Sequence, residues 1–189
     1  MAMTTHFIDI TLLPDPEFSQ AQLFGALVAK LHRALVQLRT DDIGISFPGY
    51  SLRPRSLGRV LRVHGGEPAL LGLMKHAWLQ GMRDHVAVTA VGLVPAGATH
   101  QIVQRRQFKT NADRMRRRRM QRKGESMEQA AEAIPDSVER TPNLPYVQIR
   151  SASTGQPFCL FIEQVGVPAG ALGPFNRYGL SQGASVPCF

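Results

Sequence analysis

The stretch that decides the fold is residues 6–38, HFIDITLLPDPEFSQAQLFGALVAKLHRALVQL. Residues 6–12 alternate apolar and polar side chains and contain Ile and Phe, which predicts a strand. A long helix is expected next, with Pro14 and Asp15 at its start. Its apolar side chains recur at helical spacing and predict one buried stripe, formed by Phe24, Leu27, Val28, Leu31, Leu35 and Leu38.

The same alternation continues outward from this unit. We expect strands at 43–48 and 59–64, a helix at 68–82 and a strand at 85–94. The order βαββαβ predicts an α+β protein whose N-terminal domain, residues 1–96, is ferredoxin-like and resembles RNA-recognition (RRM-like) modules.

Composition changes after Pro95, so residues 97–189 are expected to form a smaller C-terminal α/β region. An arginine-rich helix at about 111–123 is its main feature, capped by Thr110 or Asn111 and ended by Gly124. The tail is rich in Gly and Pro and should fold back over the body. The remaining elements are expected at 101–109, 126–133, 145–151 and 157–163.

The chain of 189 residues has a net charge of +8, and its placement is informative. Residues 101–123 contain eight arginines, two lysines and one aspartate, a net of +9, so the rest of the chain carries a net of −1. Such a local excess predicts a polyanion site. Two cysteines, no apolar run of the ~20 residues needed to span a bilayer and no leader favour a cytoplasmic protein without membrane contact.

Arginine occurs on every side of the expected basic helix. Arg114, Arg118 and Arg122 share one stripe, and Arg116, Arg119 and Lys123 share another. A helix with so few apolar residues is not expected to bury a face in a core, so its charge must be met by a partner or by water. Nucleic acid is the favoured partner, and a solvated face or a protein contact is the alternative. Since side chains reach the deep groove of A-form RNA only near helix ends or loops, a short hairpin fits better than a long duplex.

Metal and cofactor chemistry is not indicated, because the six histidines form no HExxH pair and none is spaced with a cysteine as a ligand pair. RNA carries its own nucleophile, the 2′-hydroxyl, which a suitably placed base can activate. His32, between Lys30 and Arg33 at the rim of the helix stripe, is a candidate base, although a rim histidine is most often structural. The RSASTGQ segment offers Ser151 and Ser153 to a ribose, and Tyr178 could orient a histidine; each alone is ordinary.

Segments along nearly the whole chain occur in an order and spacing typical of one family: PDPEFSQAQL, AKLHRALV, IGISFP, WLQGMRDHV, QRRQFKTNADRMRRRRMQR, IPDSVER, LPYVQIRSASTGQPFCLFI and RYGLSQG. Together they resemble the type I-F CRISPR RNA-processing endoribonuclease family. The resemblance implies cleavage of CRISPR repeat RNA at the base of its stem-loop to give mature crRNA. It implies metal-independent attack by the 2′-hydroxyl, with 2′,3′-cyclic phosphate and 5′-hydroxyl products. The enzyme would keep the hairpin as a subunit of the type I-F crRNA-guided surveillance complex.

The resemblance also implies residue roles. His32 would be the general base, Ser151 would fix the ribose of the attacking hydroxyl, and Tyr178 would position the histidine. Arg105 and Gln107 would read bases at the bottom of the stem. The remaining expected RNA contacts are Arg114, Arg117, Arg118 and Arg122 on the basic helix, Ser153 and Thr154 on the RNA backbone, and Phe158 stacked under the last base pair.

Four positions depart from the family pattern: Gln121, Ala152, Pro157 and Cys188. None removes a catalytic match. Two rival hypotheses remain, a non-catalytic subunit that binds the same hairpin and a basic protein of ribosomal type that binds many RNAs. The joint presence of His32, Ser151 and Tyr178 favours the enzyme.

Overall fold

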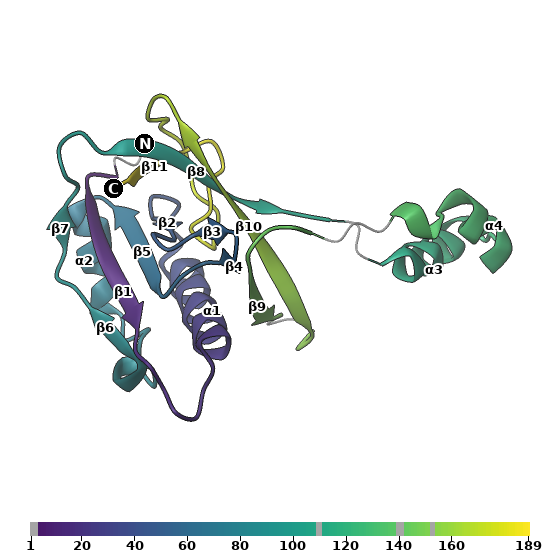
Figure 1. Ribbon diagram of the computed structural model, residues 1–189, viewed down its shortest axis with the longest axis horizontal. Coiled ribbons are helices and arrows are strands. Elements are labelled where there is room, and N and C mark those ends of the chain that lie inside the picture. Colours follow the sequence, from purple (N-terminus) through teal and green to yellow (C-terminus); the bar gives the residue numbers. More distant parts are fainter. Residues whose placement is uncertain (1–3, 109–110, 139–141, 152–153) are drawn as a thin grey trace. The chain divides into compact units, whose positions relative to one another are not determined.

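The computed structural model describes residues 4–108, 111–138, 142–151 and 154–189 (Figure 1). The chain divides into two compact units, a larger one of residues 1–105 and 144–189 and a smaller one of residues 106–143. This division by compactness does not test the expected boundary at residue 96, which stays a prediction. No helix in the described ranges is long and apolar enough to cross a membrane.

The first half of the larger unit is built on an antiparallel sheet. β1 (His6–Leu12) lies at its centre and pairs with β5 (Val60–Gly65), β6 (Val86–Val88) and β7 (Gly92–Leu93). β2 (Gly44–Ser46) pairs with the far side of β5, so the strand order is β2-β5-β1-β6. The expected strand at 85–94 is therefore two short strands, and a 3₁₀ turn, η1 (Arg83–His85), precedes them.

The helix α1 (Gln20–Leu38) begins later than its sequence suggested. Ser19 caps it, and Ser19 and Gln22 form a reciprocal capping box in which each side chain accepts from the other's backbone N–H. The expected start at Pro14 and Asp15 was wrong, because the Asp15 carboxylate instead closes a turn by accepting from the N–H groups of Glu17 and Phe18.

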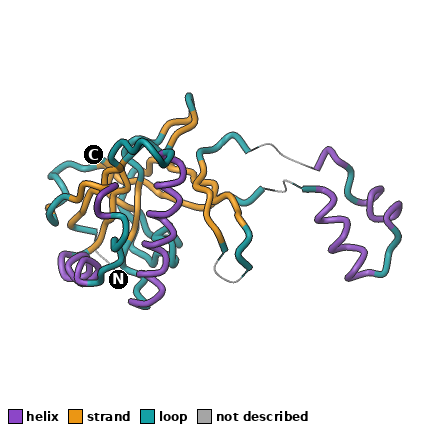
Figure 2. The backbone as a smooth tube through the Cα atoms, turned by 90° about the horizontal axis from the view of Figure 1, so that it is seen from below, coloured by secondary structure: helices purple, strands orange, loops and turns teal. Residues whose placement is uncertain are grey.

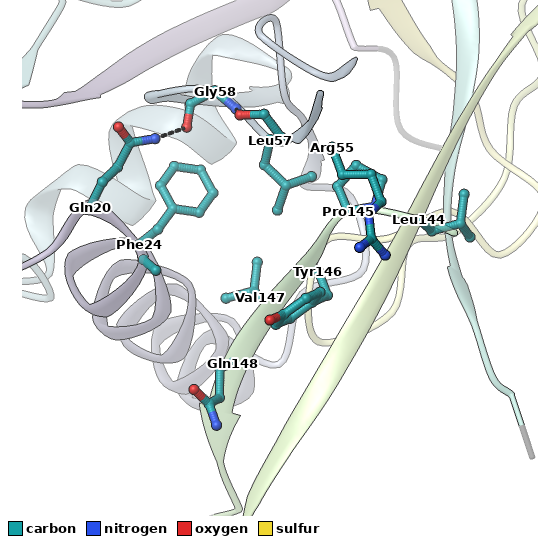
Figure 3. Close-up of a pocket in the computed structure, with 12 residues that line it drawn as sticks. Gln20, Phe24, Arg55, Leu57, Gly58, Leu144, Pro145, Tyr146, Val147 and Gln148 are labelled. Carbon is teal, nitrogen blue, oxygen red and sulfur yellow. Dashed lines mark hydrogen bonds between the residues drawn. The ribbon is translucent and has the colours of Figure 1, made fainter. Parts of the chain in front are cut away.

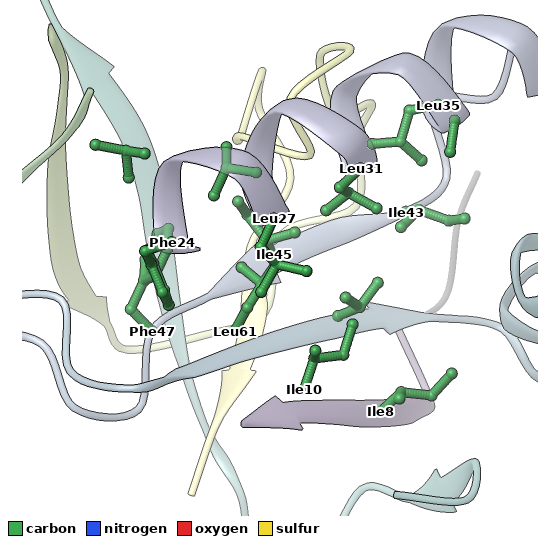
Figure 4. Close-up of a cluster of buried hydrophobic side chains, with 14 of the residues drawn as sticks. Ile8, Ile10, Phe24, Leu27, Leu31, Leu35, Ile43, Ile45, Phe47 and Leu61 are labelled. Atoms are coloured by element: carbon green, nitrogen blue, oxygen red, sulfur yellow. The ribbon is translucent and has the colours of Figure 1, made fainter. Parts of the chain in front are cut away.

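The core lies between α1 and this sheet (Figure 4). Leu27, Leu31 and Leu35 on α1 face Ile10 on β1 and Ile45 on β2, and all five are almost completely buried. The predicted stripe is confirmed except at its end, where Leu38 is only partly buried. α2 (Glu67–Lys75) is shorter than the expected 68–82, because the chain leaves the helix at His76 in an extended conformation.

The second half of the larger unit is a four-stranded sheet in the order β11-β8-β10-β9. It comprises β8 (Thr99–Arg106), β9 (Tyr146–Arg150), β10 (Pro157–Val167) and β11 (Val186–Cys188). The pairing of β11 with β8 confirms that the tail folds back over the body. A small hairpin of β3 (Ser51–Leu52) and β4 (Arg55–Ser56) was not predicted. The helices and antiparallel sheets make the protein α+β, as expected.

In its described residues the smaller unit contains two helices and a 3₁₀ turn, η2 (Asp136–Val138) (Figure 2). α3 (Ala112–Lys123) has the predicted bounds: Asn111 caps it by accepting from the Arg114 N–H at 2.6 Å, and Gly124 ends it at φ 68°. α4 (Met127–Ala133) starts from a second capping box at Ser126 and Gln129 and packs against α3.

Candidate active site and RNA interface

His32 occupies the rim of the α1 stripe, next to the buried Leu31, and is itself half-buried. Its Nδ1 lies 2.8 Å from the backbone oxygen of Arg177. A carbonyl oxygen can only accept, so Nδ1 carries the proton in this contact. In the neutral ring Nε2 is then unprotonated and can accept a proton.

Tyr178 lies flat against His32, with ring centroids 3.9 Å apart and an interplanar angle of 3°. A tight loop holds it there. The Asn176 side-chain oxygen accepts from the N–H groups of Tyr178 and Leu180, and the Asn176 backbone oxygen accepts from Gly179 N–H. Gly179 has φ +73°, and a Cβ there would lie 2.8 Å from Ile45, so this loop requires glycine.

The loop also supplies residues that sequence reasoning had not assigned to the site. Arg177 provides the carbonyl for His32, and its guanidinium donates to the backbone oxygen of Thr40 at 2.6 Å. Asn176 organises the turn. The local signal for this loop was its turn chemistry, Asn followed three residues later by Gly.

Ser151 directly follows β9, the strand that packs against α1. The two elements approach closely because Gly25 on α1 has no side chain: a Cβ there would lie 2.4 Å from the backbone oxygen of Gln148 on β9. Ser151 is half-buried, and its hydroxyl oxygen accepts from Thr154 N–H at 3.3 Å. Thr154 is exposed, as a contact to RNA requires, whereas Ser153 lies outside the described residues.

The neighbours of His32 and Ser151 line one hollow between α1 and β9. Ala29 and Arg33 line it from α1, and Arg150 and Pro157 from the β9–β10 hairpin. The segments that contain His32 and Ser151 therefore both border this hollow.

Arg105 and Phe158 lie on the neighbouring strands β8 and β10. The Arg105 guanidinium lies 5.7 Å from the centre of the half-buried Phe158 ring, an aromatic–cation pair suited to a base face. Gln107 is exposed just past the end of β8.

The α3 arginines divide into two sets. Arg116 donates to Asp113, Asp136 and the backbone oxygen of Ile134. Arg119 donates twice to Glu125, and this lowers the pKa of the glutamate. As expected, α3 does not bury a face in a core, because among its residues only Ala112 is buried. The expectation that its charge must be met by a partner or by water was wrong for Arg116 and Arg119, which carboxylates of the smaller unit neutralise. The predicted RNA contacts all lie in the exposed set: Arg114, Arg117, Arg118 and Arg122.

The chain belongs to the family described as CRISPR-associated protein (Cas_Csy4), whose model matches residues 7–189, which confirms the family predicted from the sequence. A curated relative, the CRISPR-associated endonuclease Cas6/Csy4 of Pseudomonas aeruginosa (strain UCBPP-PA14), is 45% identical over 185 residues, 97% of this chain and 99% of the relative. The protein of the same name from Escherichia coli (strain UTI89 / UPEC) is 38% identical over the same shares of both chains.

Proposed function

We propose that this protein is an endoribonuclease that cleaves CRISPR repeat RNA at the base of its stem-loop and generates mature crRNA. The observation that carries the proposal is the arrangement at His32, where the Arg177 carbonyl and the Tyr178 ring hold the imidazole so that, in its neutral form, Nε2 is the nitrogen without a proton. The names of the relatives, CRISPR-associated endonucleases, agree with it.

In the proposed reaction His32 Nε2 takes the proton of the 2′-hydroxyl. The 2′-oxygen attacks the adjacent phosphorus, the bond from phosphorus to the 5′-oxygen breaks, and that oxygen takes up a proton. The products are a 2′,3′-cyclic phosphate and a 5′-hydroxyl, and no metal takes part. Ser151 is assigned to the ribose, since it directly follows β9 beside the hollow that the neighbours of His32 line, and a serine hydroxyl can both donate to and accept from a ribose oxygen.

The RNA contacts follow from exposure and charge. Arg105, Gln107 and Phe158 are assigned to the lowest base pairs, the exposed arginines of α3 to the groove and phosphates of the stem, and Ser153 and Thr154 to the RNA backbone. The strand order β2-β5-β1-β6, antiparallel throughout, supports a ferredoxin-like N-terminal domain. We further propose a cytoplasmic protein that keeps its hairpin product within a type I-F surveillance complex.

The test is cleavage of a labelled repeat hairpin in EDTA by the wild type and by His32→Ala. We expect the wild type to cut once, leaving a cyclic phosphate, and the variant to bind the hairpin without cutting it. Binding without cleavage by both proteins would instead identify a non-catalytic RNA-binding subunit. Cleavage only after magnesium is added would contradict the mechanism.

A further inference from the structure

The hollow beside His32 and Ser151 extends along α1 away from both residues, and this extended surface has the chemistry of a nucleic-acid site but is used by none of the proposed hairpin contacts. It is a groove made of two adjoining hollows that share Ala21 and Gln148, one of about 700 Å³ and one of about 490 Å³. Its walls are α1 on one side, and β9 with the turn after β4 on the other. We call it the flank groove.

Four cations line the flank groove: Lys30, Arg33, Arg55 and Arg150. None of its lining residues is a carboxylate. Within the part of the chain that the structure describes, the exposed side chains of Arg33 and Arg150 make no hydrogen bond or ion pair. Two unneutralised guanidinium groups across a hollow favour a phosphate-bearing ligand.

The end of the flank groove farthest from His32 offers an aromatic surface (Figure 3). Tyr146 is 51% exposed and rests against Phe161, with ring centroids 5.5 Å apart. Gln20 borders this end and donates to the backbone oxygen of Gly58 at 2.8 Å. Cations that follow a groove toward an exposed aromatic ring are the usual features of a single-strand site, where the cations meet phosphates and the ring stacks a base.

The position of the flank groove indicates which strand it takes. Across the second sheet the order is β8, β10, β9, and α1 packs on β9. The proposed stem-base contacts, Arg105 and Phe158, lie on β8 and β10, while the groove lies beyond β9. Arg150 and Arg33 are the chain neighbours of Ser151 and His32, so a strand that leaves the stem base past the two proposed catalytic residues would next meet these arginines. In the proposed reaction that strand would be the one that leaves after the cut.

We propose that the flank groove binds the single-stranded RNA on the 3′ side of the cut, an inference that rests on the proposed cleavage at the stem base. From Arg33 to Gln20 the groove follows fourteen residues of α1, about 20 Å at a rise of 1.5 Å per residue, which is room for several nucleotides. The leaving strand is held until the bond breaks, and thereafter only the hairpin contacts remain.

The test uses the full chain and a repeat hairpin with a 2′-deoxy sugar at the attacking nucleotide, so that the flank stays attached. Dissociation constants are measured for hairpins with no flank and with an eight-nucleotide 3′ flank. For the wild type we expect the flank to tighten binding roughly tenfold at low salt, with a salt dependence steeper by about 0.7 in log–log slope for each added phosphate contact.

The variant is Arg33→Glu with Arg150→Glu. We expect the flanked and unflanked hairpins to bind it equally, with the unflanked affinity within about threefold of wild type. The matched control, Arg53→Glu with Arg83→Glu, changes the net charge equally at two exposed positions outside the groove and should keep the flank effect. Arg150 is next to Ser151 in the chain, so a second variant, Arg55→Glu, changes a groove residue that is not next to a proposed catalytic residue. This variant should lose only the gain in affinity that comes from lengthening a two-nucleotide flank to eight nucleotides.

The proposal is overturned if the flank does not tighten binding to the wild type, if the Arg33/Arg150 variant keeps the effect, or if the control loses it equally. The outcomes that contradict the flank groove can be told apart from failure of the proposed function. If the proposed function is wrong, the wild type will leave an all-ribose hairpin uncut or will fail to bind the unflanked hairpin. The inference about the flank groove would then be contradicted as well.

Discussion

The ring of Tyr178 lies parallel to the imidazole of His32 at 3.9 Å, and the carbonyl of the preceding residue, Arg177, fixes the Nδ1 proton. The two residues come from α1 and from a loop near the end of the chain. One side of the histidine is thus fixed by backbone and ring contacts, while Nε2 stays available.

Tyr178→Phe should keep most of the cleavage rate, because stacking needs the ring and the described contacts to the Tyr178 side chain do not involve its hydroxyl. Tyr178→Ala removes the ring and lets the imidazole tilt, so we expect a loss on the order of 100-fold. Single-turnover cleavage with saturating enzyme measures both. If the phenylalanine variant were as slow as the alanine variant, the hydroxyl would be the important group instead.

Gly25→Ala should destabilise the protein and slow cleavage. The new Cβ would lie 2.4 Å from the backbone oxygen of Gln148, so α1 and β9 must separate, at a cost of about 1–3 kcal/mol. Gly72→Ala in α2 is the control, since a Cβ there meets nothing within 4 Å and alanine favours the helix by about 0.5–1 kcal/mol. Urea unfolding gives both values. Equal stability changes of the same sign would contradict the close approach of α1 and β9.

Arg118→Ala should weaken hairpin binding and lower the slope of log affinity against log salt by about 1, as expected for one lost phosphate contact. Arg119→Ala removes the same charge from the same helix, but its guanidinium is already bound to Glu125. Its salt slope should stay near wild type. Identical slopes for the two variants would show that the helix acts through total charge alone.

Acid should destabilise the larger unit through His64. This side chain is completely buried, with Nε2 bound to the Ser46 hydroxyl at 2.8 Å, and burial, assisted by the charge of Arg62, lowers its pKa from 6.5 to about 3. Below pH 6.5 His64 is protonated in the unfolded chain but stays neutral in the folded chain until the pH approaches 3. The contribution of neutral His64 to the free energy of unfolding is therefore complete above pH 6.5. It is lost as the pH falls toward 3, by roughly 1.4 kcal/mol per pH unit.

The measurement is the free energy of unfolding from urea titrations between pH 7 and 4, for the wild type and for His64→Leu with Ser46→Ala. The double variant leaves no unpaired hydroxyl and should show a shallower decline, because only its carboxylates and other histidines titrate. Parallel curves would mean that His64 does not titrate differently in the two states.

Local sequence patterns predicted correctly the elements that do not depend on tertiary contacts. The bounds of β1 and α3 follow from alternation and from capping residues next to the helix. The start of α1 was misplaced because Pro14 and Asp15 imitate a helix start, while the side chain of Asp15 serves a turn. The short strands β3, β4 and β11 carry too few residues for a period and depend on their pairing partners.

Less of the candidate site could be predicted from local sequence patterns. Nothing next to His32 in the sequence indicates Tyr178, and only the family resemblance suggested the pair; their stacking is a tertiary contact. The division of the α3 arginines was also hidden, because it depends on Glu125 and Asp136, which lie beyond the helix. The catalytic and RNA-binding roles stay predictions that the proposed variants test.

The ion pairs of the smaller unit have a thermodynamic consequence. Among its residues whose burial the structure describes, only Ala112 and Ala130 are buried. The helix pair is therefore stabilised by the ion pairs of Arg116 and Arg119 with their carboxylate partners in place of a hydrophobic core. Added salt weakens such pairs as it weakens arginine–phosphate contacts. Folding of this helix pair and capture of the hairpin should therefore be linked equilibria, in which bound RNA protects the unit from unfolding and the folded unit tightens its hold on RNA.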